Sequence, residues 1–149
     1  MDQYRVMLDT PKQAISWSGF TQRDNHAGHI LGVAELVDAQ GITMPGYTLQ
    51  IEVKAAAEVN RCLYLFSIMH LHNKKRLRAY QLEVAPQNKR THIGNPNIYG
   101  PHEHVGEEDE PTPVVSDDVN CDNWESVVRW FFTRVSVTPF PIENPLCQV

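Results

Sequence analysis

The middle of the chain alternates between apolar and polar residues in a way that predicts β-strands. Residues 30–38 (ILGVAELVD) have an extended pattern, and in residues 48–54 (TLQIEVK) apolar side chains alternate strictly with polar ones. The intervening AQGITMPGY contains two glycines and a proline, which suit a hairpin connection. We therefore expect these two segments to pair as antiparallel strands.

A second hairpin is predicted directly afterwards. Residues 62–71 (CLYLFSIMHL) form a nearly unbroken apolar run, which fits a central strand covered on both faces, although a buried helix has the same signature. We favour the strand. After the polar turn HNKKR, residues 77–84 (LRAYQLEV) place Tyr80, Leu82 and Val84 on one face. These two segments are expected to pair with each other.

The pattern changes near the end of the chain. In residues 124–135 (WESVVRWFFTRV) the apolar side chains recur at spacings of three and four, which predicts an amphipathic helix, with Asp122 and Glu125 as a capping box. The Pro-rich tail, 139–149, cannot extend this helix. Residues 1–29 are expected to form short strands or an irregular N-terminal wrap. The whole predicts one α+β domain over residues 1–149, with four or more antiparallel strands and one late helix packed on them.

The length, net charge and cysteine content of the chain limit the classes of protein to which it can belong. The 149-residue length suits one domain with one core, and the net charge of −5 disfavours broad non-specific binding to nucleic acid. No run reaches the ~18 to 20 apolar residues of a membrane span, and the first residues lack the pattern of a secretion signal. We therefore expect a cytoplasmic protein without membrane contact. The three cysteines share no CxxC spacing, so reduced thiols are expected rather than a disulfide framework or a zinc site.

The segment IYGPHEHVGEED contains the most distinctive candidate site. In an extended segment His102 and His104 point to the same face, about 7 Å apart, near enough to share a metal ion or to flank a phosphate. His70 and His72 repeat this spacing, so two such pairs could together hold a transition metal, with Glu103 or Glu107 adding oxygen ligands. Solvated or structural histidines remain the alternative.

A second candidate combines an acid on one predicted strand with E-x-K on the next. Asp38, Glu52 and Lys54 match the residue types of metal-dependent nucleases, in which two carboxylates hold magnesium or another divalent metal and a lysine stabilises charge. Charged residues on an exposed strand face would show the same pattern.

Basic residues gather around the second predicted hairpin. Arg78 leads the face of Tyr80 and could bond a phosphate with its planar fork, and Lys89 and Arg90 follow in the loop after the second strand. A solvated basic turn is the alternative. The polar loop 23–29 (RDNHAGH) is a further candidate for a site-lining loop or an Asx-turn. The sequence contains no P-loop, nucleophile elbow or dinucleotide fingerprint.

The second half of the chain resembles the TumE-like toxins of prokaryotic toxin-antitoxin pairs. The matching segments are YQLEVAP (80–86), GPHEHVGEEDE (100–110) and the helix from Trp124, with PHEHVG as the distinctive part. The resemblance implies a compact α+β protein of mobile or defence-related DNA, with RNA as its target and an antitoxin protein as a partner. It nominates His102 and His104 as catalytic.

The resemblance also nominates Glu83, which stands in the place of an acidic strand residue, whereas an arginine expected two places earlier is Gln81 here. The leading hypothesis is a metal-independent, cofactor-free ribonuclease, in which one histidine accepts the 2′-hydroxyl proton, the other protonates the leaving oxygen, and Arg78 holds the phosphate. The alternatives are a non-catalytic inhibitor or protein-binding module of a mobile element, and the magnesium nuclease.

Overall fold

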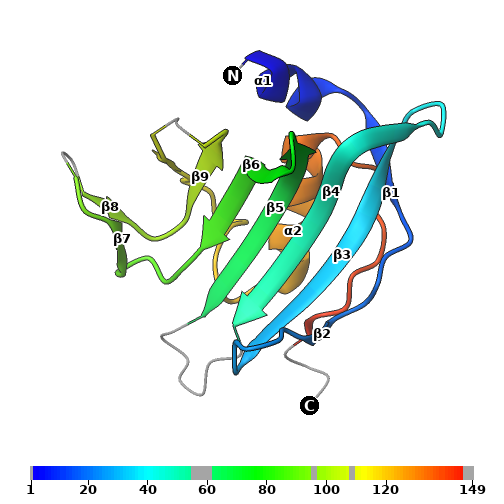
Figure 1. Ribbon diagram of the computed structural model, residues 1–149. Coiled ribbons are helices and arrows are strands. Elements are labelled where there is room, and N and C mark those ends of the chain that lie inside the picture. Colours follow the sequence, from blue (N-terminus) through cyan, green and yellow to red (C-terminus); the bar gives the residue numbers. More distant parts are fainter. Residues whose placement is uncertain (1, 55–61, 95–96, 108–109, 146–149) are drawn as a thin grey trace.

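The computed structural model describes residues 2–54, 62–94, 97–107 and 110–145. An eight-stranded sheet runs in the order β1-β3-β4-β5-β6-β9-β10, with β2 also paired to β3, and β7 and β8 form a separate hairpin (Figure 1). The elements are α1 (Asp2–Asp9), β1 (Lys12–Ile15), β2 (Thr21–Gln22), β3 (His29–Asp38), β4 (Thr43–Lys54), β5 (Leu63–His72), β6 (Lys75–Val84), β7 (Arg90–His92), β8 (Ile98–Tyr99), β9 (His102–Val105), β10 (Thr112–Pro113) and α2 (Trp124–Val135). The expected α+β class, with a mostly antiparallel sheet and a C-terminal helix, is confirmed.

The four long strands β3 to β6 follow the predicted alternation and pair antiparallel in chain order. The apolar run becomes strand β5 and not a helix. Asn73 and Lys74 join β5 to β6 with φ values of 50° and 65°, the left-handed backbone that a tight two-residue hairpin turn requires. The second face of the sheet carries the polar partners in the alternation, including Gln50, Ser67 and Gln81.

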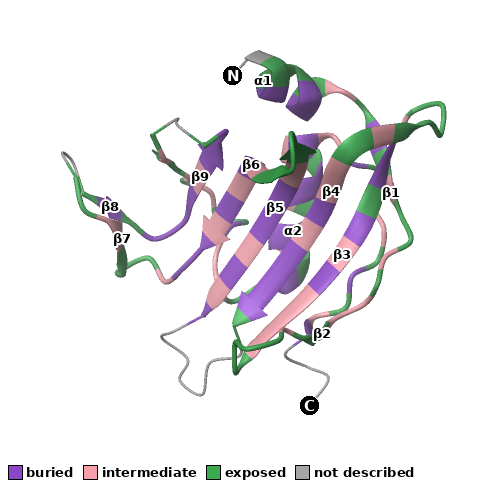
Figure 2. Ribbon diagram, viewed as in Figure 1, coloured by how far each residue is buried: buried purple, intermediate pink, exposed green. Residues whose placement is uncertain are grey.

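Helix α2 covers one face of this sheet, and its buried side is purple in Figure 2. Phe131 lies against Phe66 and Tyr80, with ring centroids 5.2 and 6.1 Å apart, so this is the core face. The N-cap is Asn123, whose side chain accepts from Ser126 N, rather than the predicted Asp122. Among the described residues, no helix is long and apolar enough to cross a membrane.

The N-terminal segment differs from the expectation. Residues 2–9 form helix α1, although a short strand or irregular wrap was predicted. Tyr4, Met7 and Leu8 are buried and stand three and four positions apart, which is the helical spacing, whereas Val6 is 65% exposed. Tyr4, Val6 and Leu8 also fit an alternating pattern, because a short helix offers few positions to separate the two periods. The wrap does contain the short strands β1 and β2.

Two cysteines expected to be reduced are joined instead. Cys62, directly before β5, and Cys121, in the loop before α2, form a disulfide across 59 residues of sequence, with their Cα atoms 6.1 Å apart. The spacing along the chain held no signal for this pair because the fold alone brings the two segments together. Cys147 lies outside the described residues, as does the end of the predicted Pro-rich tail.

Candidate metal centre

Strand β9 presents His102 and His104 on one face of the sheet, as predicted. It pairs with β6 so that His102 lies opposite Glu83 and His104 opposite Gln81. Gly100 and Gly106 bracket the strand with φ values of 71° and 76°, so both ends need a backbone that favours glycine. Because side chains alternate, both imidazoles lie on the face away from α2.

Glu103, between these two histidines, points to the other face and serves the core. Its carboxylate accepts from the Tyr80 hydroxyl at 2.7 Å and pairs with Arg134 of α2 at 3.0 Å. Because of these two interactions, Glu103 is not available as the metal ligand that the sequence suggested. Glu107 is also engaged, since its carboxylate accepts from the backbone N–H of Arg78 at 2.6 Å.

A third histidine, His92, completes a cluster. It ends β7, and its ring centroid lies 4.7 Å from that of His102 and 5.3 Å from that of His104, while the latter two rings are 5.2 Å apart. One nitrogen of each ring lies within 4.8 Å of the others. Sequence reasoning missed His92, which stands alone in a polar loop. Its position depends on the β7–β8 hairpin packing beside β9 (Figure 1).

The ring of His102 is held in one orientation. Its side chain is fully buried, and its Nδ1 lies 3.2 Å from the carbonyl oxygen of Gly100 and 3.2 Å from the hydroxyl of Thr91. Since a carbonyl can only accept, Nδ1 carries the proton in that contact, and the Nε2 atom of the neutral ring presents its lone pair. Nε2 lies 3.5 Å from the Glu83 carboxylate.

Three buried side-chain nitrogens of the described residues have no hydrogen-bond partner, and all three come from this one place. They are His102 Nε2, His104 Nδ1 and Arg78 Nε. Buried polar atoms in folded proteins are normally paired, because each unpaired one costs about 1–3 kcal/mol. None of these three atoms has a hydrogen-bond partner among the described residues, so a bound ligand could supply one.

The electrostatics keep the buried rings neutral. Burial lowers the pKa of His104 to about 4, with further lowering by the Arg78 charge and by the neighbouring histidines. Burial also lowers the pKa of His102, although the Gly100 carbonyl and Glu83 oppose the shift. Neutral imidazoles are the form that binds a metal ion.

Of the predicted phosphate-binding residues, Arg78 is the one whose charge acts on His102 and His104. The prediction that Arg78 shares the face of Tyr80 is wrong, because a bulge intervenes: Ile68 pairs with Tyr80, but Met69 pairs with Arg78. Ala79 is therefore the extra residue, and Arg78 lies on the face of the histidines. Lys89 and Arg90 are exposed and are not among the groups that shift the pKa values of His102 and His104.

The alternative set Asp38, Glu52 and Lys54 is not brought together. Glu52 pairs with Leu31, and Asp38 stands seven positions further along β3, a separation of about 20 Å. The Asp38 carboxylate instead accepts from two backbone N–H groups of its own turn. The buried Glu52 carboxylate bonds Arg23 at 2.7 Å and His29 at 3.0 Å, both from the loop 23–29.

The second H-x-H pair also lies elsewhere. The Nδ1 atom of His70 forms a hydrogen bond with the Tyr4 hydroxyl at 3.0 Å. The His70 ring stacks on Tyr47, with ring centroids 4.2 Å apart. His72 lies beside it, at 5.5 Å between ring centroids. The cluster that could hold a metal does not include them.

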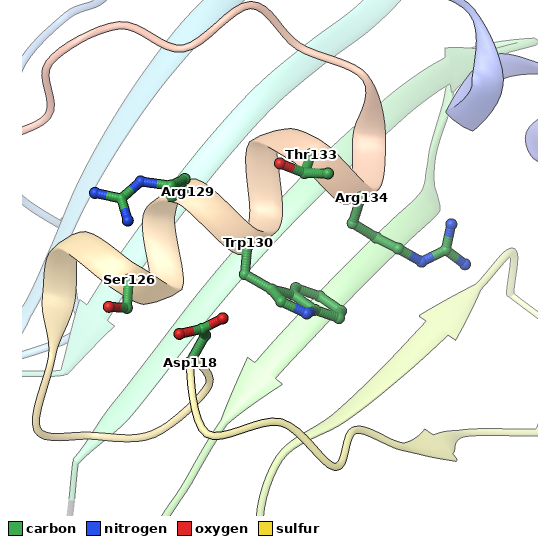
Figure 3. Close-up of a pocket in the computed structure, with 6 residues that line it drawn as sticks. All are labelled: Asp118, Ser126, Arg129, Trp130, Thr133 and Arg134. Carbon is green, nitrogen blue, oxygen red and sulfur yellow. The ribbon is translucent and has the colours of Figure 1, made fainter.

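Of two surface cavities, one adjoins the histidine cluster and the other lies along α2. One of about 340 Å³ is bordered by His92 and lined by apolar and polar groups that include Ile98, Asn97 and Glu110, so it adjoins the cluster. Another of about 330 Å³ lies on the outer side of α2. Figure 3 shows Arg129 and Arg134 extending in opposite directions there, so its cations do not converge on one ligand position.

Compared with protein-family models, with curated protein sequences and with solved structures, the chain shows no significant similarity to any of them. Its function is therefore argued from the geometry of the histidine cluster.

Proposed function

We propose that His92, His102 and His104 bind one divalent transition-metal ion and that zinc fits the site best. The observation that carries this proposal is the convergence of three imidazole nitrogens within 4.8 Å, at a place where two buried ring nitrogens lack partners. Nitrogens bound to one tetrahedral zinc ion are about 3.3 Å apart, so binding requires only a small inward movement of the rings. The contact between His102 Nδ1 and Gly100 fixes the tautomer, as it commonly does in zinc sites.

Metal binding can be measured directly on the purified chain. We expect one zinc ion per chain after dialysis, and an increase in the free energy of unfolding of about 2.7 kcal/mol when free zinc is a hundred times its Kd. His92→Ala is the informative variant, since His92 is only half-buried and its loss should leave the fold intact. Its zinc affinity should fall at least tenfold, whereas His26→Ala, at an exposed histidine outside the cluster, should bind normally. Equal binding by all three proteins would reject the site.

The same centre supports a hydrolytic function. Three protein ligands leave a fourth position for water, and a bound zinc ion lowers the pKa of that water to about 7. Glu83 is 26% exposed in its side chain and lies beside His102 Nε2, where it can act as a base toward the bound water or as a further ligand. The cavity beside His92 provides room for a substrate group.

We further propose RNA as the substrate, on the strength of the resemblance in the second half of the chain. The metal-free mechanism expected from the sequence, with His102 and His104 as acid and base, has less support, because His102 is fully buried and His104 is 6% exposed. Groups that transfer protons to a substrate must touch it. Cleavage of RNA that stops with a chelator and with Glu83→Gln favours the metal mechanism, and cleavage that survives the chelator favours the acid–base pair.

The non-catalytic protein-binding role and the antitoxin partner stay predictions, tested by pull-down with the RNA assay in parallel. The cytoplasmic location also stays a prediction. The disulfide between Cys62 and Cys121 is of a kind that persists mainly in oxidising compartments. Trapping free thiols in intact cells would show whether Cys62 and Cys121 are reduced or joined in the cell.

A further inference from the structure

The third unpartnered atom of the cluster, Arg78 Nε, is not explained by metal binding. It is a buried N–H donor, whereas a neutral imidazole can present a lone pair at its unpartnered nitrogen. Arg78 reaches this face only because of the bulge at Ala79. Its charge is close enough to lower the pKa of both His102 and His104.

A metal ion in the cluster would stand next to this guanidinium, and the two cations would repel each other. Glu83 and Glu107 supply two negative charges nearby, against three positive charges from a divalent ion and Arg78. A net positive charge remains in a partly buried place. An anion could complete such a site, with one oxygen toward the metal and another that would accept from Arg78 Nε.

We propose, on the basis of the metal site above, that the metal centre and Arg78 together bind a phosphoryl group. A phosphate has several acceptor oxygens in a tetrahedral arrangement, so it can bridge a metal ion and an arginine N–H, and its charge matches the positive excess. The substrate is thereby assigned to the phosphate esters, and Arg78 is a substrate-binding residue. Apolar or cationic substrates would leave the Arg78 donor unpaired.

The test measures binding of inorganic phosphate to the zinc-loaded protein by calorimetry. In Arg78→Met the affinity for phosphate should fall about tenfold or more, the loss expected for a hydrogen bond to a charged group, while zinc binding persists. The control is Arg76→Met, two positions earlier on β6, where the guanidinium bonds Gln50 of β4, across the intervening strand β5. This variant should bind phosphate as the wild type does. Should Arg78→Met fail to fold, Arg78→Lys gives the same comparison, with the fixed Nε donor removed and the charge retained.

The outcomes separate the two proposals. Zinc binding with equal phosphate affinity in the wild type and the Arg78 variants would overturn the role of Arg78 and leave the metal site standing. Absence of zinc binding in the wild type would overturn both. Loss of phosphate affinity in Arg78→Met, with zinc binding intact and the Arg76 variant unchanged, would support the assignment.

Discussion

Lys12 offers a sharp test of the structure, because it is a buried lysine. Its side chain is 1% exposed, and its ammonium group donates to the backbone carbonyl of Val135, the last residue of α2. The backbone of Lys12 also bonds Ser136 and Thr138, so β1 and the end of α2 are tied together. Burial lowers the pKa of Lys12 from 10.5 to about 8, although Asp9 opposes the shift.

This shift makes stability depend on pH in a defined direction. Between pH 8 and 10.5 the folded chain has lost the Lys12 proton and the unfolded chain still holds it, so stability rises with pH in that window. At 1.36 kcal/mol per pKa unit, the full gain is up to about 3 kcal/mol, of which about 2.5 kcal/mol falls between pH 7 and pH 10. In Lys12→Met this gain is absent.

The assay is urea unfolding of the wild type and Lys12→Met at pH 7, 8, 9 and 10. Tyr4, Tyr47 and Tyr80 have raised pKa values, which makes stability fall at the alkaline end, but they are present in both proteins. The difference in unfolding free energy between the two proteins therefore isolates Lys12. We expect the wild type to gain about 2 to 3 kcal/mol on the variant from pH 7 to pH 10. Parallel pH curves would refute the burial of this ammonium group.

Two further predictions concern the fold. Reduction of the disulfide, or Cys62→Ser, should cost about 4 kcal/mol of unfolding free energy, because the bond closes a loop of 59 residues; unchanged urea midpoints with and without reductant would show that Cys62 and Cys121 are not joined in solution. Asn123→Ala should cost about 1 kcal/mol through the lost N-cap of α2, and Asp122→Ala, at the position expected from the sequence, should cost little. The reverse order of these two losses would restore the sequence assignment.

The sequence predicted those parts of the fold that have many repeats of one period. Strands β3 to β6 each contain at least ten residues, and α2 contains twelve, so alternation and helical spacing are distinguishable there. Helix α1, with eight residues, and the strands of two to four residues offer too few positions for either period to be recognised. Their structure depends on contacts distant in sequence.

The residues of the site could be predicted only where they lie together on one strand. His102 and His104 were found because their spacing of two falls within one strand. His92 joins them through the position of a short hairpin, which no local pattern determines. The face on which Arg78 lies was predicted wrongly because a single extra residue, Ala79, reverses the alternation, and nothing in LRAYQLEV marks the bulge.

The arrangement around the cluster is hard to explain as structural packing alone. Leaving His102 Nε2, His104 Nδ1 and Arg78 Nε buried without partners costs about 1–3 kcal/mol for each atom, and apolar side chains in these places would avoid that cost. The other buried side-chain polar atoms of the described residues have partners, as Gln81 has in Ser67 at 3.0 Å and Glu52 has in Arg23. Among the described residues, the fold thus leaves open one buried place, where two imidazole nitrogens and one guanidinium N–H meet. That combination is what a metal ion carrying an oxyanion would complete, and neither ligand alone would pair all three atoms.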